Sequence, residues 1–222
     1  MDIAILGGTG AFGGGLALRW GSDTGHRVVV GSREADRARE AADEYEATLA
    51  EAGVDRPIGA GTNTEATADA DVVVLAVPPY HVSDTIETVA DALAPGTIVV
   101  SPAVGIRRDD RGWHYHEPSV GSVAEVAARA VPDDCPVVGA LHTLPAGRLA
   151  DLSATLDLDT VVVGDDPDAR ETIAALADGI EGVRALSGGP AVNAAEIEAV
   201  TPLLVNLARE NDGLGDLGVR FQ

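Results

Sequence analysis

The sequence predicts an α/β protein of the Rossmann type: a doubly wound parallel sheet with a small C-terminal helical segment. Apolar strand-like runs alternate with helical stretches, the run at 71–77 is apolar on both faces, and a glycine-rich turn follows the first run. The expected strands are 3–6, 27–30, 71–77, 97–100, 136–140 and 160–163. The expected helices between them are 12–20, 33–52, 81–94, 122–130 and 167–180.

The length of the chain suits one α/β domain with a small addition. A chain of 222 residues can bury most of its apolar surface without disulfides or metals. We expect residues 1–150 to form the Rossmann domain and residues 151–222 to form a smaller C-terminal region.

Two segments stand outside the alternation. Residues 105–122 form a charged stretch with Trp113 and Tyr115, and a lid, a dimer contact and a plain surface excursion all remain open for it. The segment after Pro190 has apolar residues at helical spacing, and Pro202 within it predicts a kink. This last helix is expected to form the floor of a second binding surface or the interface of a homodimer.

The charge balance is strongly acidic. Asp and Glu number 36 against 15 basic residues, the net charge is −21, and every basic residue is arginine. Such a chain repels nucleic acid, so we expect no nucleic-acid partner. Because the acids are spread along the chain, we interpret them as a surface adapted to high salt, typical of a halophilic archaeon.

A single cysteine, Cys135, excludes an intramolecular disulfide and a multi-cysteine metal site. No apolar run reaches membrane length, and the first expected strand begins directly after Asp2. We therefore expect a cytoplasmic protein without a metal and without a membrane anchor.

The glycine-rich turn has the spacing of a dinucleotide-binding loop. Gly8, Gly10 and Gly13 satisfy the pattern G-x-G-x-x-G directly after the first strand and at the start of a helix. Glycine turns the chain, lets the backbone approach a pyrophosphate and lets the helix pack close to the strand. The amides at the start of the helix then point at the phosphates.

The end of the second strand indicates which dinucleotide is bound. A site for NAD usually carries an acid there, to accept hydrogen bonds from the ribose hydroxyl. This chain has Ser32 and Arg33 instead, with Arg37 one helical turn later. Guanidinium groups bind phosphate through paired hydrogen bonds, so we expect NADP(H), although neighbouring acids compete for both arginines.

Several motifs together resemble the NADPH-dependent coenzyme F420 reductases of archaea and some actinobacteria. The resemblance covers essentially the whole chain, to the closing Leu217-Gly-Val-Arg-Phe221. The motifs are Gly7-Gly-Thr-Gly10, Val30-Gly-Ser-Arg33, Val77-Pro-Pro-Tyr-His81, Val100-Ser-Pro102, Leu141-His-Thr-Leu-Pro145, Val163-Gly-Asp-Asp166 and Thr201-Pro-Leu-Leu204. The segment Leu141–Pro145 and the Thr-Pro pair are the most specific of them.

This resemblance implies reversible hydride transfer between C4 of the nicotinamide and C5 of the deazaflavin coenzyme F420, with the two rings stacked in one cleft. It implies that the adenosine half of NADP contacts Gly8, Thr9, Gly10, Ala11, Phe12, Ser32, Arg33 and Arg37. The path to the nicotinamide would be lined by Val77, Pro78, His81, Val104 and Ala146. The deazaflavin would meet His142, Leu144 and Thr201.

Ring-to-ring transfer needs positioning rather than a nucleophile or an obligatory base. We therefore expect no catalytic residue in the strict sense, with His142 as a polarising contact to the deazaflavin. From the residues alone, a histidine that holds its loop is an equally good interpretation. His81 is expected to begin the helix that follows Pro79.

The chain departs from the family pattern at two positions. Leu144 stands where isoleucine is more common, and Ala195 stands where some members have an arginine. If that arginine binds the anionic tail of the deazaflavin, this chain must use another one, and Arg148 and Arg184 are the candidates.

Two other functions fit the same fold. One is an NADP-dependent imine or hydroxyacid reductase of the pyrroline-carboxylate type, which usually needs a larger helical domain and an acid or base such as lysine. The other is an NADPH-sensing module without catalytic activity, in which the segment Leu141–Pro145 would have no ring to face.

Overall fold

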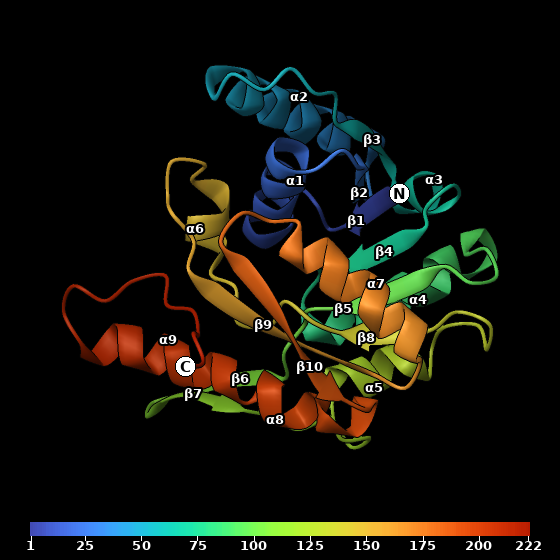
Figure 1. Ribbon diagram of the computed structural model, residues 1–222. Coiled ribbons are helices and arrows are strands. Elements are labelled where there is room, and N and C mark those ends of the chain that lie inside the picture. The colour runs from blue at the N-terminus through green and yellow to red at the C-terminus, as the bar shows by residue number, and fades with distance from the viewer.

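An eight-stranded sheet forms the centre of the computed structural model, which describes residues 1–222 (Figure 1). Its strand order is β10-β9-β8-β5-β4-β1-β2-β3. The strands are β1 (Asp2–Leu6), β2 (Arg27–Ser32), β3 (Gly59–Thr62), β4 (Val72–Leu75), β5 (Ile98–Ser101), β8 (Val137–Gly139), β9 (Leu158–Gly164) and β10 (Val183–Gly189). The order and the flanking helices confirm the predicted Rossmann-type class.

One pair of strands departs from the wholly parallel sheet that the sequence predicted. β9 runs antiparallel to β8, whereas the other pairs in the sheet are parallel. The connection from β8 to β9 contains only the short helix α6 (Ala146–Ala150), so it lacks the longer helix that usually carries a parallel crossover across the sheet. The chain therefore enters β9 from the edge at which it left β8.

Helices cover both faces of the sheet. They are α1 (Ala11–Asp23), α2 (Ala35–Glu51), α3 (Asn63–Thr67), α4 (Val82–Val89), α5 (Val123–Ala128), α6, α7 (Pro167–Asp178), α8 (Ala194–Glu198) and α9 (Val200–Glu210). Short 3-10 turns are formed by Pro79–His81, Ala90–Ala92 and Ala191–Asn193. No helix is long and apolar enough to cross a membrane.

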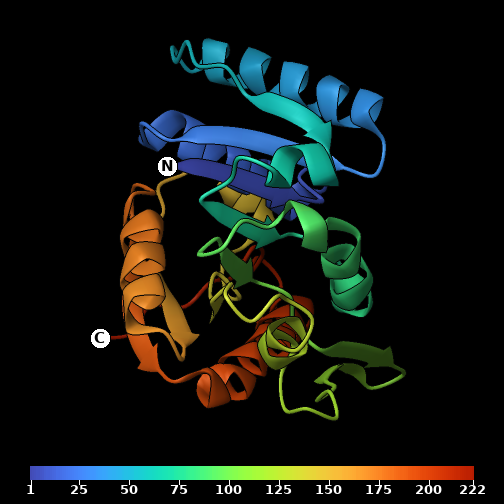
Figure 2. The ribbon, with the colours of Figure 1, turned by 90° about the vertical axis from the view of Figure 1, so that its right-hand side faces the viewer.

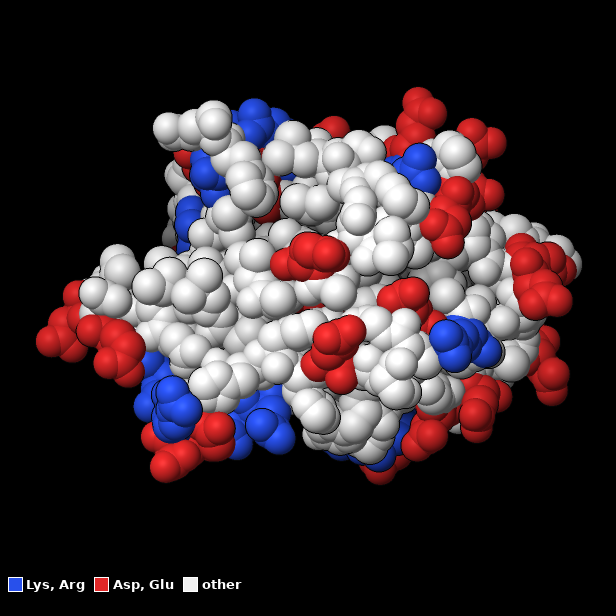
Figure 3. Space-filling model, turned by 90° about the horizontal axis from the view of Figure 1, so that it is seen from below, with Lys and Arg blue, Asp and Glu red and all other residues white.

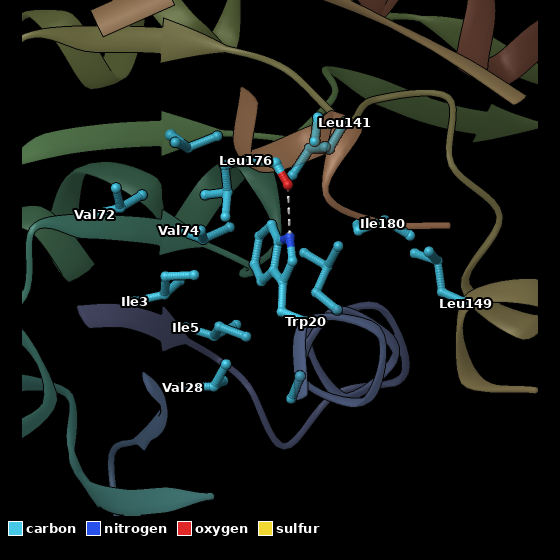
Figure 4. Packing of buried hydrophobic residues seen from close by; sticks show 14 of the residues in the cluster. Ile3, Ile5, Trp20, Val28, Val72, Val74, Leu141, Leu149, Leu176 and Ile180 are labelled. Atoms are coloured by element: carbon cyan, nitrogen blue, oxygen red, sulfur yellow. Dashed lines mark hydrogen bonds between the residues drawn. The ribbon is translucent and has the colours of Figure 1, made fainter. Parts of the chain in front are cut away.

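The two faces of β1 belong to different parts of the core. Ile3 and Ile5 pack in the larger cluster with residues of α1, α2 and α7, and Ala4 and Leu6 pack in the smaller cluster with residues of α3, α4 and α5. Alternate side chains of a strand point to opposite faces, so a strand covered on both sides is apolar throughout. In the larger cluster the indole N–H of Trp20 donates to the carbonyl of Leu176 at 3.1 Å (Figure 4).

The predicted boundary at residue 150 falls between α6 and β9. The strands β9 and β10 from the C-terminal region continue the same sheet, so both regions share one core. In Figure 1, α8, α9 and the hairpin of β6 (Ile106–Asp109) and β7 (Gly112–Tyr115) lie at the opposite end of the molecule from α2 and β3.

The charged stretch 105–122 contains an antiparallel hairpin of β6 (Ile106–Asp109) and β7 (Gly112–Tyr115). Figure 2 shows this hairpin projecting from the body of the molecule. The predicted last helix is divided into α8 and α9 at Ala199. Pro202 lies in the first turn of α9, where its missing N–H leaves the carbonyl one turn earlier without a helical partner.

Candidate functional site

A cavity of about 810 Å³ opens at the carboxyl ends of β1, β2 and β4. Ligands of doubly wound sheets bind at this edge. The cavity is lined by eight of the residues predicted from the sequence, namely Thr9, Gly10, Ser32, Arg33, Arg37, Val77, Pro78 and His81. Sequence reasoning missed the opposite wall, which includes Thr62, Asn63, Thr64, Asp84, Thr85 and Thr88.

The glycines of the first turn are required by close backbone approach. Gly7 has a φ of +79°, and a Cβ there would lie 2.5 Å from the carbonyl oxygen of Ala76. A Cβ on Gly8 would lie 2.8 Å from the carbonyl oxygen of Ile5, and one on Gly13 would lie 2.8 Å from the Cα of Gly8. The sharp turn therefore depends on Gly7, while Gly8 and Gly13 allow strand, turn and helix to pack closely.

The start of α1 is free to bind an anion. Its N-cap is Gly10, no side chain caps it, and its first turn carries no acid. By contrast, Thr62, Ser122 and Asp166 cap α3, α5 and α7 with their side chains. A 13-residue helix with uncapped amides and a positive dipole end suits a pyrophosphate, so this cradle fits a dinucleotide.

Tyr45 of α2 supports the glycine turn, and sequence reasoning missed it. Its hydroxyl donates to the carbonyl of Gly8 at 2.9 Å. Its ring also lies against Gly14, where a Cβ would collide with the phenol. Burial raises the pKa of Tyr45, so the phenol stays protonated and keeps donating. The run of three glycines at 13–15 was the available signal for this contact.

Arg33 and Arg37 lie at the mouth of the cavity on the side of β2. Both side chains belong to exposed residues, and neither forms an ion pair with the neighbouring acids. Ser32, at the end of β2, is buried beside them. The competition from Glu34 and Asp36 is therefore not realised, and two guanidinium groups remain available for a phosphate.

His142 follows β8 and is buried, with 5% of its surface exposed. Neither Nδ1 nor Nε2 has a hydrogen-bond partner. Burial lowers the pKa of His142 to about 4, so the ring is neutral and offers one donor and one acceptor. A buried polar ring without partners usually serves a ligand or an ordered water.

The backbone around His142 is held by three hydroxyl groups. Leu141 has a φ of +68°, and its N–H donates to Thr160 Oγ1 at 2.8 Å. The hydroxyl of Thr201 donates to the carbonyl of His142 at 2.8 Å, and that of Thr143 donates to the carbonyl of Asp159 at 3.2 Å. These bonds fix a strained turn at the carboxyl end of β8.

The other predicted site residues, on the adenosine side as well as near the rings, do not line the cavity. Gly8, Val104 and Leu144 are buried, Phe12, Ala146 and Thr201 are partly exposed, and Ala11 is exposed. The structure brings Thr201 and His142 together, but it shows no open cavity that joins them to the nicotinamide side. His81 directly precedes α4 as its N-cap residue, as the sequence predicted.

Glu198 of α8 is a second buried group that sequence reasoning missed. Its carboxylate accepts the N–H groups of Val123 at 2.8 Å and Ala124 at 3.1 Å, and the hydroxyl of Tyr115 at 3.2 Å. The backbone of Gly105 also contacts it. Burial raises the pKa of Glu198 despite these donors. The residue connects α8, the start of α5 and the base of the hairpin.

The two arginines considered for an anionic tail are both engaged elsewhere. Arg148 donates to the carbonyl of Thr155 at 2.6 Å. Arg184 donates to both carboxylate oxygens of Asp159, at 2.8 and 2.7 Å. Arg184 is held in this ion pair because the side chain of Asp159 has no exposed surface and requires cationic partners.

The family model and the curated relatives that match this chain belong to the same family. Residues 2–105 match the family described as "NADP oxidoreductase coenzyme F420-dependent". The chain is 36% identical to the F420-dependent NADP reductase of Methanocaldococcus jannaschii, over 93% of this chain and 92% of that protein. It is 37% identical to that of Methanothermobacter marburgensis, over 100% of this chain and 98% of that protein.

Solved structures share the fold. A protein of Arthrobacter sp. FB24, provisionally assigned as an F420-dependent NADP reductase, has a TM-score of 0.76 at 22% identity, over 95% of this chain and 94% of that one. A pyrroline-5-carboxylate reductase of Coxiella burnetii has a TM-score of 0.58 at 18% identity, over 97% of this chain and 72% of that one. At these identities the likeness concerns the fold alone.

Proposed function

Because the chain belongs to the family of coenzyme F420-dependent NADP oxidoreductases, we propose that the glycine turn with Arg33 and Arg37 holds NADP(H) and that the His142 segment faces coenzyme F420. The chain is an oxidoreductase that uses both coenzymes. The observation that carries the assignment of residues is the cavity with uncapped amides at one end and two unpaired guanidinium groups at the other.

The two coenzymes supply the redox chemistry when bound: a hydride leaves C4 of the reduced nicotinamide and bonds to C5 of the deazaflavin, whose ring nitrogen takes a proton from solvent. The task of the chain is to hold the two rings in contact and to exclude water. The amides at the start of α1 orient the pyrophosphate, and Val77 and Pro78 form an apolar wall on the way to the nicotinamide.

His142 is proposed to bind a polar edge of the deazaflavin. Its neutral ring has two nitrogens without partners, and Thr201 and the strained Leu141 hold its backbone in place. A neutral imidazole can donate to a ring oxygen without introducing a buried charge. A small movement of the buried segment is needed to admit the ring, and binding of the first coenzyme is a suitable trigger.

The NADP half of the proposal is tested by replacing Arg33 and Arg37 together with alanine. Equilibrium titration with NADPH and NADH should show at least about tenfold weaker binding of NADPH and little change for NADH, because charge-assisted phosphate contacts are lost. Arg39→Ala, an exposed arginine on the same helix, is the matched control. Equal weakening for both dinucleotides would contradict the assignment of these arginines.

The deazaflavin half is tested by His142→Asn, with His26→Asn as the control. Titration followed by the fluorescence of F420 should show weaker binding in the first variant only, while both variants bind NADPH normally. Unchanged binding of F420 by the His142 variant would instead favour a histidine that merely holds its loop. A chain that binds NADPH but no deazaflavin would favour the NADPH-sensing alternative.

The oligomeric state and the cellular environment of the chain are further parts of the proposal. Leu203 and Leu207 lie on α9 with 55% and 41% of their surfaces exposed, which supports a homodimer that covers this helix. Sedimentation of the wild type against a variant with both leucines changed to glutamate tests it, because only the wild type should sediment as a dimer.

The net charge of −21 supports a halophilic archaeal cytoplasm, and unfolding at low salt would agree with it.

A further inference from the structure

The β6–β7 hairpin carries a group of free arginines in an acidic chain. Arg107, Arg108 and Arg111 are exposed, and none forms an ion pair. The chain has only 15 basic residues against 36 acidic ones, so three cations within one short hairpin stand out. Figure 3 views the molecule from the end that carries α9 and the hairpin, and arginines gather on parts of this face.

The nearest acid of the hairpin is already engaged. Asp109 Oδ1 accepts the N–H of Arg111 at 2.9 Å and lies 3.0 Å from Nε2 of His114. The guanidinium carbon of Arg108 lies 5.6 Å from the ring centre of Trp113, a cation–π contact that leaves its N–H groups available. The hairpin therefore orients Arg108, and its three arginines outnumber its two acids, Asp109 and Asp110.

Four other arginines of the C-terminal half are occupied, whereas Arg129 and Arg209 are exposed and form no ion pair. Arg184 and Arg220 bind Asp159, Arg148 binds a backbone carbonyl, and Arg170 donates to the carbonyl of Gly164. Arg19, which reaches this half from α1, is buried and donates to four backbone carbonyls. An anion bound on the side of His142 therefore finds free cations on the hairpin and, at Arg209, in the last turn of α9.

The hairpin begins beside a residue that the sequence predicted to line the path to the nicotinamide. Its base follows directly after Val104, and there the N–H of His116 donates to the carbonyl of Gly105 at 2.9 Å. Strands rise about 3.3 Å per residue, so Arg107 and Arg108 lie on the order of 10 Å from Val104 along the chain. The arginines are thus placed outward from the ring site rather than at it.

Helix α9 runs from the same site to the same arginines. It begins beside His142, to which Thr201 is bonded, and Asn206 lies about 8 Å further along its axis. The side-chain amide of Asn206 accepts the N–H of Trp113 at 2.9 Å and donates to its carbonyl at 2.6 Å. Gly112 is required beside it, because a Cβ there would lie 2.8 Å from Asn206 Oδ1. This paired contact fixes the hairpin against α9.

We propose that Arg107, Arg108 and Arg111 bind the anionic arm of coenzyme F420, the phosphodiester and carboxylates that its ring carries on a polyhydroxylated chain. The proposal rests on the proposed placement of the ring at His142. Phosphate and carboxylate are the groups that guanidinium binds with paired hydrogen bonds. The free arginines and their place on a hairpin that is bonded to α9 suit an arm that extends outward from His142 along this surface.

The test compares two ligands and two triple variants. The ligands are F420 and the same deazaflavin with only its uncharged ribityl chain, which lacks the anionic arm. One variant changes Arg107, Arg108 and Arg111 to glutamine, and the control changes Arg39, Arg56 and Arg129, which have no ion pairs and are remote in sequence. Dissociation constants for both ligands and for NADPH are measured by fluorescence titration at several salt concentrations.

We expect the hairpin variant to bind F420 about three- to tenfold more weakly than the wild type, with a smaller dependence on salt. Its affinity for the armless deazaflavin and for NADPH should equal that of the wild type, and the control should match the wild type for all ligands. Equal affinity of wild type and hairpin variant for F420 would overturn the proposal. So would a loss of self-association in the hairpin variant without any effect on F420. If the wild type binds neither deazaflavin, the placement of the ring itself is wrong.

Discussion

The hydroxyl of Thr201 donates a hydrogen bond to the backbone carbonyl of His142, with 2.8 Å between the oxygens. This bond connects the first turn of α9 to the turn that follows β8. It brings together two residues that are 59 positions apart in the sequence, in the part of the site proposed for the deazaflavin. The first prediction concerns this bond.

Thr201→Val should weaken F420 binding several-fold and lower stability by about 1 kcal/mol, because the carbonyl of His142 loses its partner. NADPH affinity should not change. Thr172→Val removes a hydroxyl bond of the same kind in α7, to the carbonyl of Asp168 at 2.9 Å, and serves as the control. Chemical denaturation and coenzyme titration measure both effects. Equal F420 affinities in the two variants would show that the bond is irrelevant to the site.

The second prediction concerns pH. Burial depresses the pKa of His142 from 6.5 to about 4, so the fold favours its neutral form. This contribution is fully present above the unfolded pKa and is lost as the pH falls from about 6.5 toward 4, on the order of 3 kcal/mol in all. Urea unfolding between pH 7 and 4 should show a smaller loss in His142→Asn than in the wild type. Parallel profiles would mean that His142 is not buried as a neutral ring.

Glu198 should give the stability the opposite dependence on pH. Burial raises its pKa above 4.5 in the fold, so its contribution is fully present below pH 4.5 and is lost as the pH rises through the raised value. In Glu198→Gln this decline should be absent, although the variant is less stable because an amide N–H₂ faces the N–H groups of Val123 and Ala124. If Glu198→Asp restores part of the lost stability, the carboxylate group rather than the packing of the side chain accounts for the effect. A variant with the wild-type pH profile would contradict this account.

The fourth prediction concerns the C-terminal tail. Asp159 binds Arg184, Arg220 and the N–H of Phe221. The Arg184 guanidinium, with the other two donors, holds the pKa of Asp159 at about 2. Asp159→Asn should free the tail, lower the Tm by about 5 °C and expose Arg220 to trypsin. In the wild type the tail should likewise be released, and stability lost, as the pH falls from about 4 toward 2 and the carboxylate of Asp159 becomes protonated. A tail that stays protected in the variant would show that other contacts hold it.

Local patterns were sufficient to predict many of the residues that line the cavity proposed for the dinucleotide. The glycine turn, Ser32, Arg33 and Arg37 are close in sequence to a strand end, and the geometry of a βαβ unit then places them at one edge. Tyr45 and the wall formed by Asn63 and Thr85 were not predictable in this way. They approach the turn only through the packing of α2, α3 and α4, which no local spacing encodes.

The antiparallel direction of β9 and the existence of β10 escaped prediction for a related reason. An apolar run does not state its direction, and β10 is half-buried with two glycines at its end. Glu198 was equally hidden, because a single acid in an acidic helix looks like a surface residue. Its role depends on the first two amides of α5, which the Ser122 cap leaves free and which lie 75 and 74 residues away in the sequence.

The central claim is that the chain holds the nicotinamide and the deazaflavin in contact, so that hydride passes directly between the rings. The most direct measurement uses NADPH with both C4 hydrogens replaced by deuterium, oxidised F420 and ordinary water, with mass and NMR analysis of the reduced F420. The account predicts one deuterium at C5 in nearly every product molecule. Reduced F420 that carries hydrogen from water at C5 would contradict direct contact between the rings.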